Sequence, residues 1–88
     1  MDDWCIYIVR CADKTLYTGI TRDVGRRVEE HNSNNNLGAR YTRARRPVKL
    51  VYQEGASNRS QASIRESEIK HLNKKEKEIL IENSQYRE

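Results

Sequence analysis

The sequence contains few of the features that indicate a disulfide framework or a metal-stapled fold. It has only two cysteines, and Cys5 and Cys11 lie six residues apart on what reads as one β-strand. At about 3.3 Å per residue this spacing places them roughly 20 Å apart, which is beyond the reach of a disulfide. Neither a CxxC pair nor a histidine cluster accompanies them, which argues against structural zinc. We therefore expect two reduced thiols in a cytoplasmic protein.

Long hydrophobic runs are also missing. The segment from Met1 to Trp4 is acidic, and no extended apolar stretch follows it, so we expect neither a signal peptide nor a membrane anchor. No internal repeat or low-complexity linker divides the sequence. The length predicts one domain, residues 1–88, with a core from about 4 to 82 and no separate module that selects a target.

Acidic residues are scarce in the middle of the chain, although the whole sequence is only mildly basic. Lys and Arg number 17 against 13 Asp and Glu, which gives a net charge of +4. Between Arg22 and Lys49 there are eight basic residues and three acidic ones, and from Arg40 to Lys49 there is no acid. Such a concentration of positive charge is typical of a surface that binds a polyanion, although a solvated basic loop has the same composition.

The pattern of apolar residues predicts an α+β domain. Three segments rich in β-branched and aromatic residues read as strands: residues 4–11, 15–20 and 48–53. Three segments read as helices: residues 22–31, 61–72 and 73–83. The order is therefore ββαβαα, with a hairpin inside a three-stranded antiparallel sheet. The first strand is apolar on both faces, which predicts a central position.

Polar residues in front of the predicted helices indicate where each one begins. Thr21 is the expected N-cap of the first helix, and Ser57 or Ser60 is the expected N-cap of the second. Asn73, followed three residues later by Glu76, has the pattern of a capping box at the start of the third.

One carboxylate falls where the packing pattern predicts an apolar residue. Glu66 lies four residues after Ala62 and three before Ile69, on the stripe of its helix that we expect to face the core. A carboxylate there is costly unless it meets a cation, a metal or hydrogen bonds. An ion pair with a helix arginine, a side chain that reaches out to solvent, and a metal ion at the edge of the core all explain the position.

Two tyrosines form a second unusual pair. Tyr7 and Tyr17 lie on the two strands of the predicted hairpin, ten residues apart around a short turn. They are candidates for cross-strand neighbours, but the register stays open. An ordinary aromatic pair explains them, and so does a chemical role, because a phenol can act as a general base when nearby cations stabilise its ionised form.

Five positions, taken in order, resemble the signature of the GIY-YIG nuclease superfamily. Cys5–Tyr7 resembles its first motif and Tyr17–Gly19 its second, and the remaining matches are Arg27, His31 and Glu66. The runs ARYTRARRPVKLVY and ASIRESEIK are similar to the small single-domain bacterial members. The resemblance covers about residues 4 to 82, which is nearly the whole chain.

The resemblance implies a role for each of these residues. Tyr17 matches the general base that takes a proton from the attacking water, and Tyr7 matches a partner tyrosine that positions or hydrogen-bonds the reacting groups. Arg27 matches the arginine that stabilises charge on the scissile phosphate. His31 matches a position that supports the site by hydrogen bonding. Glu66 matches the glutamate that holds one divalent cation, Mg²⁺ or Mn²⁺.

The chain departs from the family pattern at three positions. Cys5 replaces the glycine of the first motif and Thr18 replaces the isoleucine of the second, and both are backbone or packing positions. Ile20 stands where some relatives carry a lysine beside the base tyrosine. Another group, either Arg27 or a network of metal-bound water, must therefore assist Tyr17.

The basic stretch supplies the expected contacts with nucleic acid. Six side chains are assigned to it: Arg26, Arg40, Tyr41, Arg43, Arg45 and Arg46. For Tyr41 and the two residues that follow it, packing of the loop is the alternative explanation.

Together these features predict a metal-dependent endonuclease that hydrolyses DNA phosphodiesters, with RNA left open as a substrate. Because a single domain offers no separate recognition module, we expect cutting that is directed by the structure of the substrate or by a protein partner. No hydrophobic stripe argues for a dimer, so a monomer is expected. Two alternatives stay open: a catalytically weak accessory protein that binds nucleic acid, and a basic adaptor that docks on an acidic protein.

Overall fold

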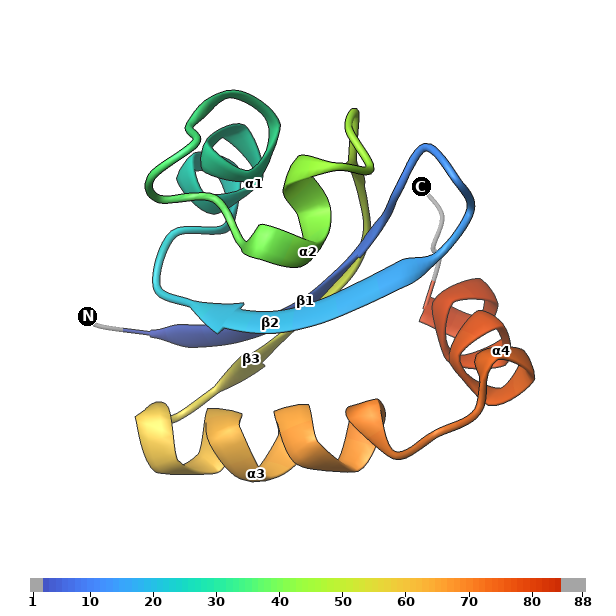
Figure 1. Ribbon diagram of the computed structural model, residues 1–88. Helices are drawn as coiled ribbons and strands as arrows, with labels where there is room; N and C mark the ends of the chain where they lie inside the picture. Colours follow the sequence, from blue (N-terminus) through green and yellow to red (C-terminus); the bar gives the residue numbers. More distant parts are fainter. Residues whose placement is uncertain (1–2, 85–88) are drawn as a thin grey trace.

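The computed structural model describes residues 3–84 and shows an α+β domain in three layers (Figure 1). Its elements, in chain order, are β1 (Trp4–Arg10), β2 (Leu16–Thr21), α1 (Val24–Ser33), α2 (Arg40–Arg43), β3 (Lys49–Ala56), α3 (Arg59–Lys70) and α4 (Lys74–Ser84). Helices α1 and α2 cover one face of the sheet, and α3 and α4 cover the other (Figure 1). The predicted fold class is confirmed, and α2 is an addition to the expected order.

The sheet has the order β2-β1-β3, and both pairs of neighbouring strands are antiparallel. The central position of β1 follows from its two apolar faces. Ile6 and Ile8 belong to the core on the α3 side, whereas Tyr7 and Val9 belong to the core on the α1 side. All four side chains are at most 1% exposed, so Tyr7 starts from a rigid position at the centre of the molecule.

A separate hydrophobic core fills each side of the sheet. The core on the α3 side consists of Ile6, Ile8, Tyr52, Ala62, Ile69 and Ile81. The core on the α1 side consists of Tyr7, Val9, Cys11 and Val48, with Tyr17, Val24, Val28 and Leu50 packed against it. Both cysteines are free, as predicted. The predicted inward stripe of α3 is confirmed at Ala62 and Ile69.

Helix α1 begins two residues later than predicted, because Asp23 and not Thr21 is its N-cap. The Asp23 Oδ1 accepts a hydrogen bond from the Arg26 amide at 3.1 Å. The Thr21 Oγ1 accepts one from the Asp23 amide at 3.1 Å and so shapes the turn in front of the helix. Both side chains can cap a helix, and the backbone conformation decides which one does.

The N-cap of α3 is likewise a neighbour of the predicted residues. Asn58 takes this position in place of Ser57 or Ser60, and its Oδ1 accepts the Gln61 amide at 2.8 Å. The predicted capping box in front of α4 is confirmed. The Asn73 amide donates to the Glu76 carboxylate at 2.9 Å, and the Glu76 amide donates back to Asn73 Oδ1 at 2.8 Å.

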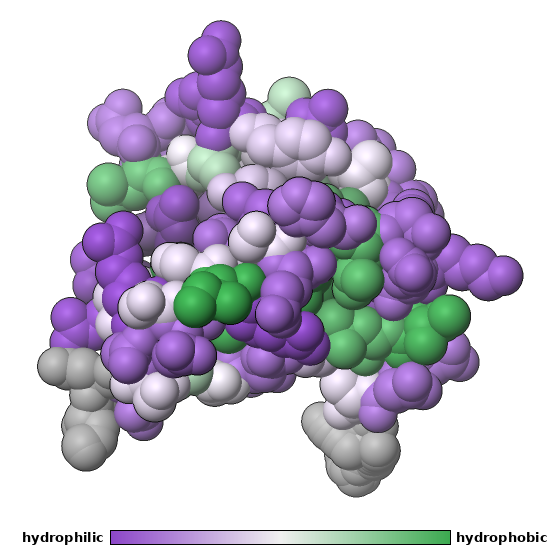
Figure 2. All heavy atoms as spheres, turned by 90° about the horizontal axis from the view of Figure 1, so that it is seen from below, coloured by the Kyte–Doolittle hydropathy of each residue, from purple (hydrophilic) through white to green (hydrophobic). Residues whose placement is uncertain are grey.

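The surface over α3 and α4 is mostly hydrophilic. Figure 2, which shows this side of the molecule, has hydrophobic side chains in one isolated spot and in a second group toward α4. The exposed large hydrophobic residues of these two helices are Ile64 and Ile79. Within residues 3–84, no helix is both long enough and apolar enough to span a membrane.

Candidate active site

The centre of the candidate site is a buried hydrogen bond between Tyr7 on β1 and His31 on α1. The Tyr7 hydroxyl lies 2.7 Å from His31 Nε2, and both side chains are at most 1% exposed. The ring centroids are 5.9 Å apart and tilted by 47°. A polar pair this deeply buried has to satisfy its own hydrogen bonds, which fixes both rings in place.

The surroundings of His31 determine which ring nitrogen carries the proton. The Ala39 amide lies 3.2 Å from Nδ1, and a backbone amide can only donate. We therefore infer that Nδ1 is the acceptor and that Nε2–H donates to the Tyr7 oxygen. Thr42 Oγ1 also lies 3.0 Å from Nδ1 and donates to the Ala39 carbonyl at 2.9 Å, which encloses this nitrogen.

Burial keeps His31 neutral. It lowers the pKa of His31 to about 4, and the positive charges of Arg27 and Arg46 act in the same direction. Burial raises the pKa of Tyr7 to about 12, against the influence of Arg27, which lowers it. The pair therefore consists of a neutral imidazole and a neutral phenol around neutral pH, with the phenol oxygen accepting from the imidazole.

Gly19 on β2 makes room for the Tyr7 ring. Tyr7 is paired with Gly19 in the sheet. A Cβ atom at Gly19 would lie 2.5 Å from the Tyr7 oxygen and 2.8 Å from its Cζ. Side chains do not approach this closely, so the phenol reaches His31 only because residue 19 is a glycine. The sequence marked Gly19 as the last residue of the second motif but did not reveal this packing.

Tyr17 lies next to the pair, on the same face of the sheet. It is paired with Val9, so Tyr7 and Tyr17 are diagonal neighbours, which settles the register that the sequence left open. The Tyr17 and His31 rings meet edge to face, with centroids 5.4 Å apart. The Tyr17 ring also stacks with that of Tyr41, with centroids 5.8 Å apart and an interplanar angle of 22°.

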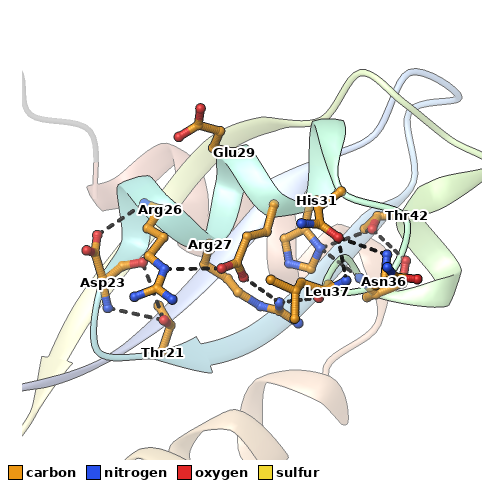
Figure 3. A network of polar contacts seen from close by, with 12 residues as sticks. Thr21, Asp23, Arg26, Arg27, Glu29, His31, Asn36, Leu37 and Thr42 are labelled. Atoms are coloured by element: carbon orange, nitrogen blue, oxygen red, sulfur yellow. Dashed lines mark hydrogen bonds and ion pairs between the residues drawn. The ribbon is translucent and has the colours of Figure 1, made fainter.

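Arg27 extends from α1 toward the Tyr7 hydroxyl. Its Nη1 donates to the Glu30 carboxylate at 2.9 Å and to the Leu37 carbonyl at 2.5 Å (Figure 3). Arg27 also interacts with the Tyr7 hydroxyl, and this interaction lowers the pKa of Tyr7. Sequence reasoning did not identify Glu30 and Leu37, although the spacing of Arg27 and Glu30 on one helix is a usable signal for an ion pair.

An open pocket of about 250 Å³ lies beside Arg27. It is lined by Thr21, Arg22, Asp23, Arg26, Arg27 and Glu30. Arg26 Nε donates to the Glu30 carboxylate at 3.2 Å, so Arg26 and Arg27 share this carboxylate. Three arginines against two carboxylates give the lining a net positive charge, which suits an anionic ligand such as a phosphate.

Glu66 belongs to α3, which packs on the opposite face of the sheet. Its neighbours on the inward stripe, Ala62 and Ile69, are fully buried, while the Glu66 side chain keeps 22% of its surface exposed. Its cation partner is Lys70 at 3.3 Å, one turn further along the helix and 51% exposed. The predicted ion pair is therefore made with a lysine and not with an arginine. The charge of Glu66 still raises the pKa of Tyr7, which places it within electrostatic reach of the buried pair.

The Glu66 carboxylate is the candidate ligand for a divalent cation. Its pairing with an exposed lysine contributes little stability and is readily exchanged. Within residues 3–84, no group of three or more His, Cys, Asp or Glu side chains could hold a metal ion. A hard cation at Glu66 would therefore keep most of its water and share the phosphate of a substrate, which is how Mg²⁺ commonly binds.

The side chains predicted to bind nucleic acid fall into two groups. Arg26, Arg40 and Arg43 are exposed, although Arg26 pairs with Glu30 at 3.2 Å and Arg43 Nη1 donates to the Asn35 carbonyl at 2.8 Å. Arg46 has three partners within the protein: Nε donates to the His31 carbonyl at 2.6 Å, and the two Nη atoms donate to Asn35 Oδ1 and to the Asn34 carbonyl. The contact of Arg46 with nucleic acid stays a prediction, and its observed partners give it a structural role at the end of α1.

Tyr41 and Arg45 also have partners within the protein. The Arg45 guanidinium lies over the Tyr41 ring, 3.9 Å from its centroid. Arg45 Nε donates to the Asp13 carboxylate at 3.1 Å, and its Nη1 donates to the Tyr41 carbonyl at 2.8 Å. Together with fully buried Thr42, these residues make the basic segment a wall of the site.

Comparison with known proteins identifies a family. The family model described as the GIY-YIG catalytic domain matches residues 3–79. The UPF0213 protein DP2720 of Desulfotalea psychrophila is 56% identical over 82 residues, which cover 93% of this chain and 74% of that protein. A UPF0213 protein of Staphylococcus aureus is 51% identical over 81 residues, which cover 92% of this chain and 96% of that protein.

Two solved structures have a similar fold. The NMR structure of the UPF0213 protein BH0048 from Bacillus halodurans has a TM-score of 0.60 and 38% identity, and the match covers 93% of this chain and 85% of that one. The NMR structure of the protein EF2693 from E. faecalis has a TM-score of 0.61 and 30% identity, and the match covers 100% of this chain and 95% of that one.

Proposed function

Because this chain belongs to the GIY-YIG family, we propose that it is a metal-dependent endonuclease that hydrolyses the phosphodiester bonds of DNA. The observation that carries the proposal is the buried hydrogen bond between Tyr7 and His31, with Tyr17 and Arg27 beside it and the charge of Glu66 acting on Tyr7 from the helix on the other face of the sheet. Packing alone does not require two phenols, an imidazole and a guanidinium so close together.

Tyr17 is the proposed general base. Hydrolysis forms a bond between the water oxygen and phosphorus and breaks the bond between phosphorus and the leaving oxygen, so the proton of the water needs an acceptor. Tyr7 is unsuited to this task, because burial raises its pKa to about 12. Its hydroxyl is instead proposed to orient the water or the phosphate, while His31 holds that hydroxyl in place.

Arg27 is proposed to stabilise negative charge on the non-bridging oxygens of the scissile phosphate. Glu30 and the Leu37 carbonyl already fix its guanidinium at the edge of a positively lined pocket. A donor fixed before the substrate arrives loses little freedom during the reaction. Bound at Glu66, Mg²⁺ or Mn²⁺ would supply neutralisation of the charge that develops on the phosphate and the departing oxygen.

The exposed arginines are proposed to hold the phosphate backbone of the DNA. Arg26, Arg40 and Arg43 are the strongest candidates, because their side chains are exposed. Backbone contacts carry no sequence information, which supports cutting directed by substrate structure or by a protein partner. With one site in each chain, a monomer would cut one strand at a time.

The test is a cleavage assay with and without Mg²⁺ on single-stranded, branched and duplex DNA and on RNA. Wild type is expected to cut at least one DNA substrate when Mg²⁺ is present, and Glu66→Gln is expected to lose at least a hundredfold in rate. Glu68→Gln is the matched control, because Glu68 lies on the same helix and its side chain is 59% exposed.

Equal cleavage by wild type and Glu66→Gln would trace the activity to a contaminating nuclease and overturn the assignment. Retained DNA binding without cleavage of any substrate would favour the accessory protein that binds nucleic acid. One observation favours this second function: Ile20 stands where some relatives carry a lysine that would assist Tyr17 as a base.

A further inference from the structure

We propose that Tyr41 is a positioning residue for Tyr17, and that Arg45 in turn holds Tyr41. This inference rests on the proposed function, because it concerns the side chain that takes the proton there. It also changes the assignment that the sequence suggested for Tyr41 and Arg45, from contacts with nucleic acid to support of the Tyr17 ring.

A continuous stack of side chains runs from Arg45 to His31. The Arg45 guanidinium lies 3.9 Å from the centroid of the Tyr41 ring. The Tyr41 ring is nearly parallel to that of Tyr17, with centroids 5.8 Å apart. The Tyr17 ring then meets His31 edge to face at 5.4 Å. Cation–π and aromatic contacts of this geometry are favourable, so the stack holds Tyr17 against the imidazole.

The Tyr41 ring is already engaged with two side chains of the protein. The Arg45 guanidinium lies over it and the Tyr17 ring is stacked with it, although 36% of the residue is exposed. A nucleobase that binds by stacking needs an open aromatic face, so it would compete with these contacts.

Arg45 already has two hydrogen-bond acceptors within the protein. Asp13, in the connection between β1 and β2, accepts from Nε at 3.1 Å, and the Tyr41 carbonyl accepts from Nη1 at 2.8 Å. An arginine that contacts a phosphate would have to give up part of this arrangement. The geometry instead ties the basic segment to the hairpin that carries Tyr17.

Tyr41 belongs to α2, a short helix that also contacts His31. Thr42, the next residue, lies 3.0 Å from His31 Nδ1. Two successive residues of α2 therefore hold the site: Tyr41 contacts Tyr17, and Thr42 contacts His31. Tyr17 itself lies on β2, an edge strand of the sheet, and is only half-buried. Without α2 its side chain would have other rotamers available, and a general base out of position loses rate.

The experiment compares Tyr41→Leu and Tyr41→Phe, with Ile79→Ala as a control for loss of an exposed hydrophobic side chain. Single-turnover cleavage, DNA affinity and NMR contacts between the Tyr17 and His31 rings are measured on each protein. Tyr41→Leu is expected to lower the cleavage rate about tenfold with unchanged DNA affinity. It should also weaken the Tyr17–His31 contacts. Tyr41→Phe keeps the stacked ring and should match wild type in all three measurements.

A weaker DNA affinity in both Tyr41 variants, with the Tyr17–His31 contacts intact, would show a contact with nucleic acid and overturn the proposal. Arg45→Met provides a second variant that leaves both tyrosine rings in place, and it should reduce the same NMR contacts less than Tyr41→Leu. If the wild-type protein cuts nothing, the proposed function fails, but the NMR contacts still decide whether Tyr41 positions Tyr17. Unchanged contacts in Tyr41→Leu would overturn the proposal in that case as well.

Discussion

The Tyr7 hydroxyl fills the space that a side chain at Gly19 would need, where β1 and β2 are paired. Gly19→Ala therefore has to displace the ring and with it the hydrogen bond to His31. We expect this substitution to lower the free energy of unfolding by about 1 to 3 kcal/mol, measured by chemical denaturation.

Gly55 on β3 provides the matched control for Gly19. It has no neighbouring atom within 4 Å of a Cβ built at its position. Gly55→Ala should leave stability unchanged or raise it by up to about 1 kcal/mol, because alanine restricts the unfolded chain. Equal effects of the two substitutions would contradict the packing of Tyr7 over Gly19.

The buried imidazole makes stability depend on pH in a defined window. An unfolded histidine binds a proton near pH 6.5, whereas His31 in the folded protein does so only at about pH 4. As the pH falls through this window, the unfolded state takes up a proton that the folded state does not. Stability should therefore decrease by about 3 kcal/mol between pH 6.5 and pH 4.

The measurement is the free energy of unfolding at a series of pH values. His31→Gln should remove this part of the dependence, while His71→Gln should keep it, since His71 is exposed. A wild-type protein whose stability changes with pH no more than that of His31→Gln would show that His31 titrates normally.

The sequence suggested the members of the proposed site but not the contacts that join them. Tyr7 and His31 are separated by 24 positions, and neither helical nor strand periodicity relates them. The partners of His31 were out of reach for another reason. The Ala39 amide is part of the backbone, and Thr42 lies in a segment whose composition indicates only a basic loop.

Among the secondary-structure elements, helix α3 matters for the proposed function because it carries Glu66. Its N-cap provides a direct test of the structure, since Asn58 Oδ1 accepts the Gln61 amide. Asn58→Ala should lower the free energy of unfolding by about 1 kcal/mol. Ser60→Ala should change it by less than about 0.5 kcal/mol, because Ser60 lies within the helix. The reverse ranking in thermal or chemical denaturation would contradict the observed cap.

The strands and long helices could be predicted because each has an apolar stripe of the matching period. The ends were less predictable, since Ser, Thr, Asp and Asn stand close together in front of α1 and α3 and all can cap. Helix α2 escaped prediction for a different reason. It has four residues, and its N-cap, Ala39, provides no side-chain hydrogen bond, so it depends on buried Thr42 and on contacts with α1.

For the whole molecule, the concentrated positive charge should appear in the salt dependence of DNA binding. If Arg40 contacts a phosphate, Arg40→Ala should reduce the slope of log affinity against log salt concentration by about 1. The fold should be unaffected, because the side chain is exposed. An unchanged slope would exclude Arg40 from the interface.

Arg46→Ala should behave differently, because its guanidinium donates to three acceptors within the protein. Here we expect a loss of about 1 to 3 kcal/mol in the free energy of unfolding. Denaturation and salt titration of both variants thus separate charge that faces the DNA from charge that holds the fold together.

Glu66 comes much later in the chain than Tyr7 and His31, and this order has a consequence for the synthesis of the protein. Four residues of the proposed site lie within the first 31 positions, namely Tyr7, Tyr17, Arg27 and His31. Glu66 belongs to α3, which is synthesised near the end of the chain. Under the proposed function, a nascent chain could attract nucleic acid before it could cut it. Cleavage would begin only once α3 has docked, so a chain that ends before Arg59 should bind DNA without cutting it.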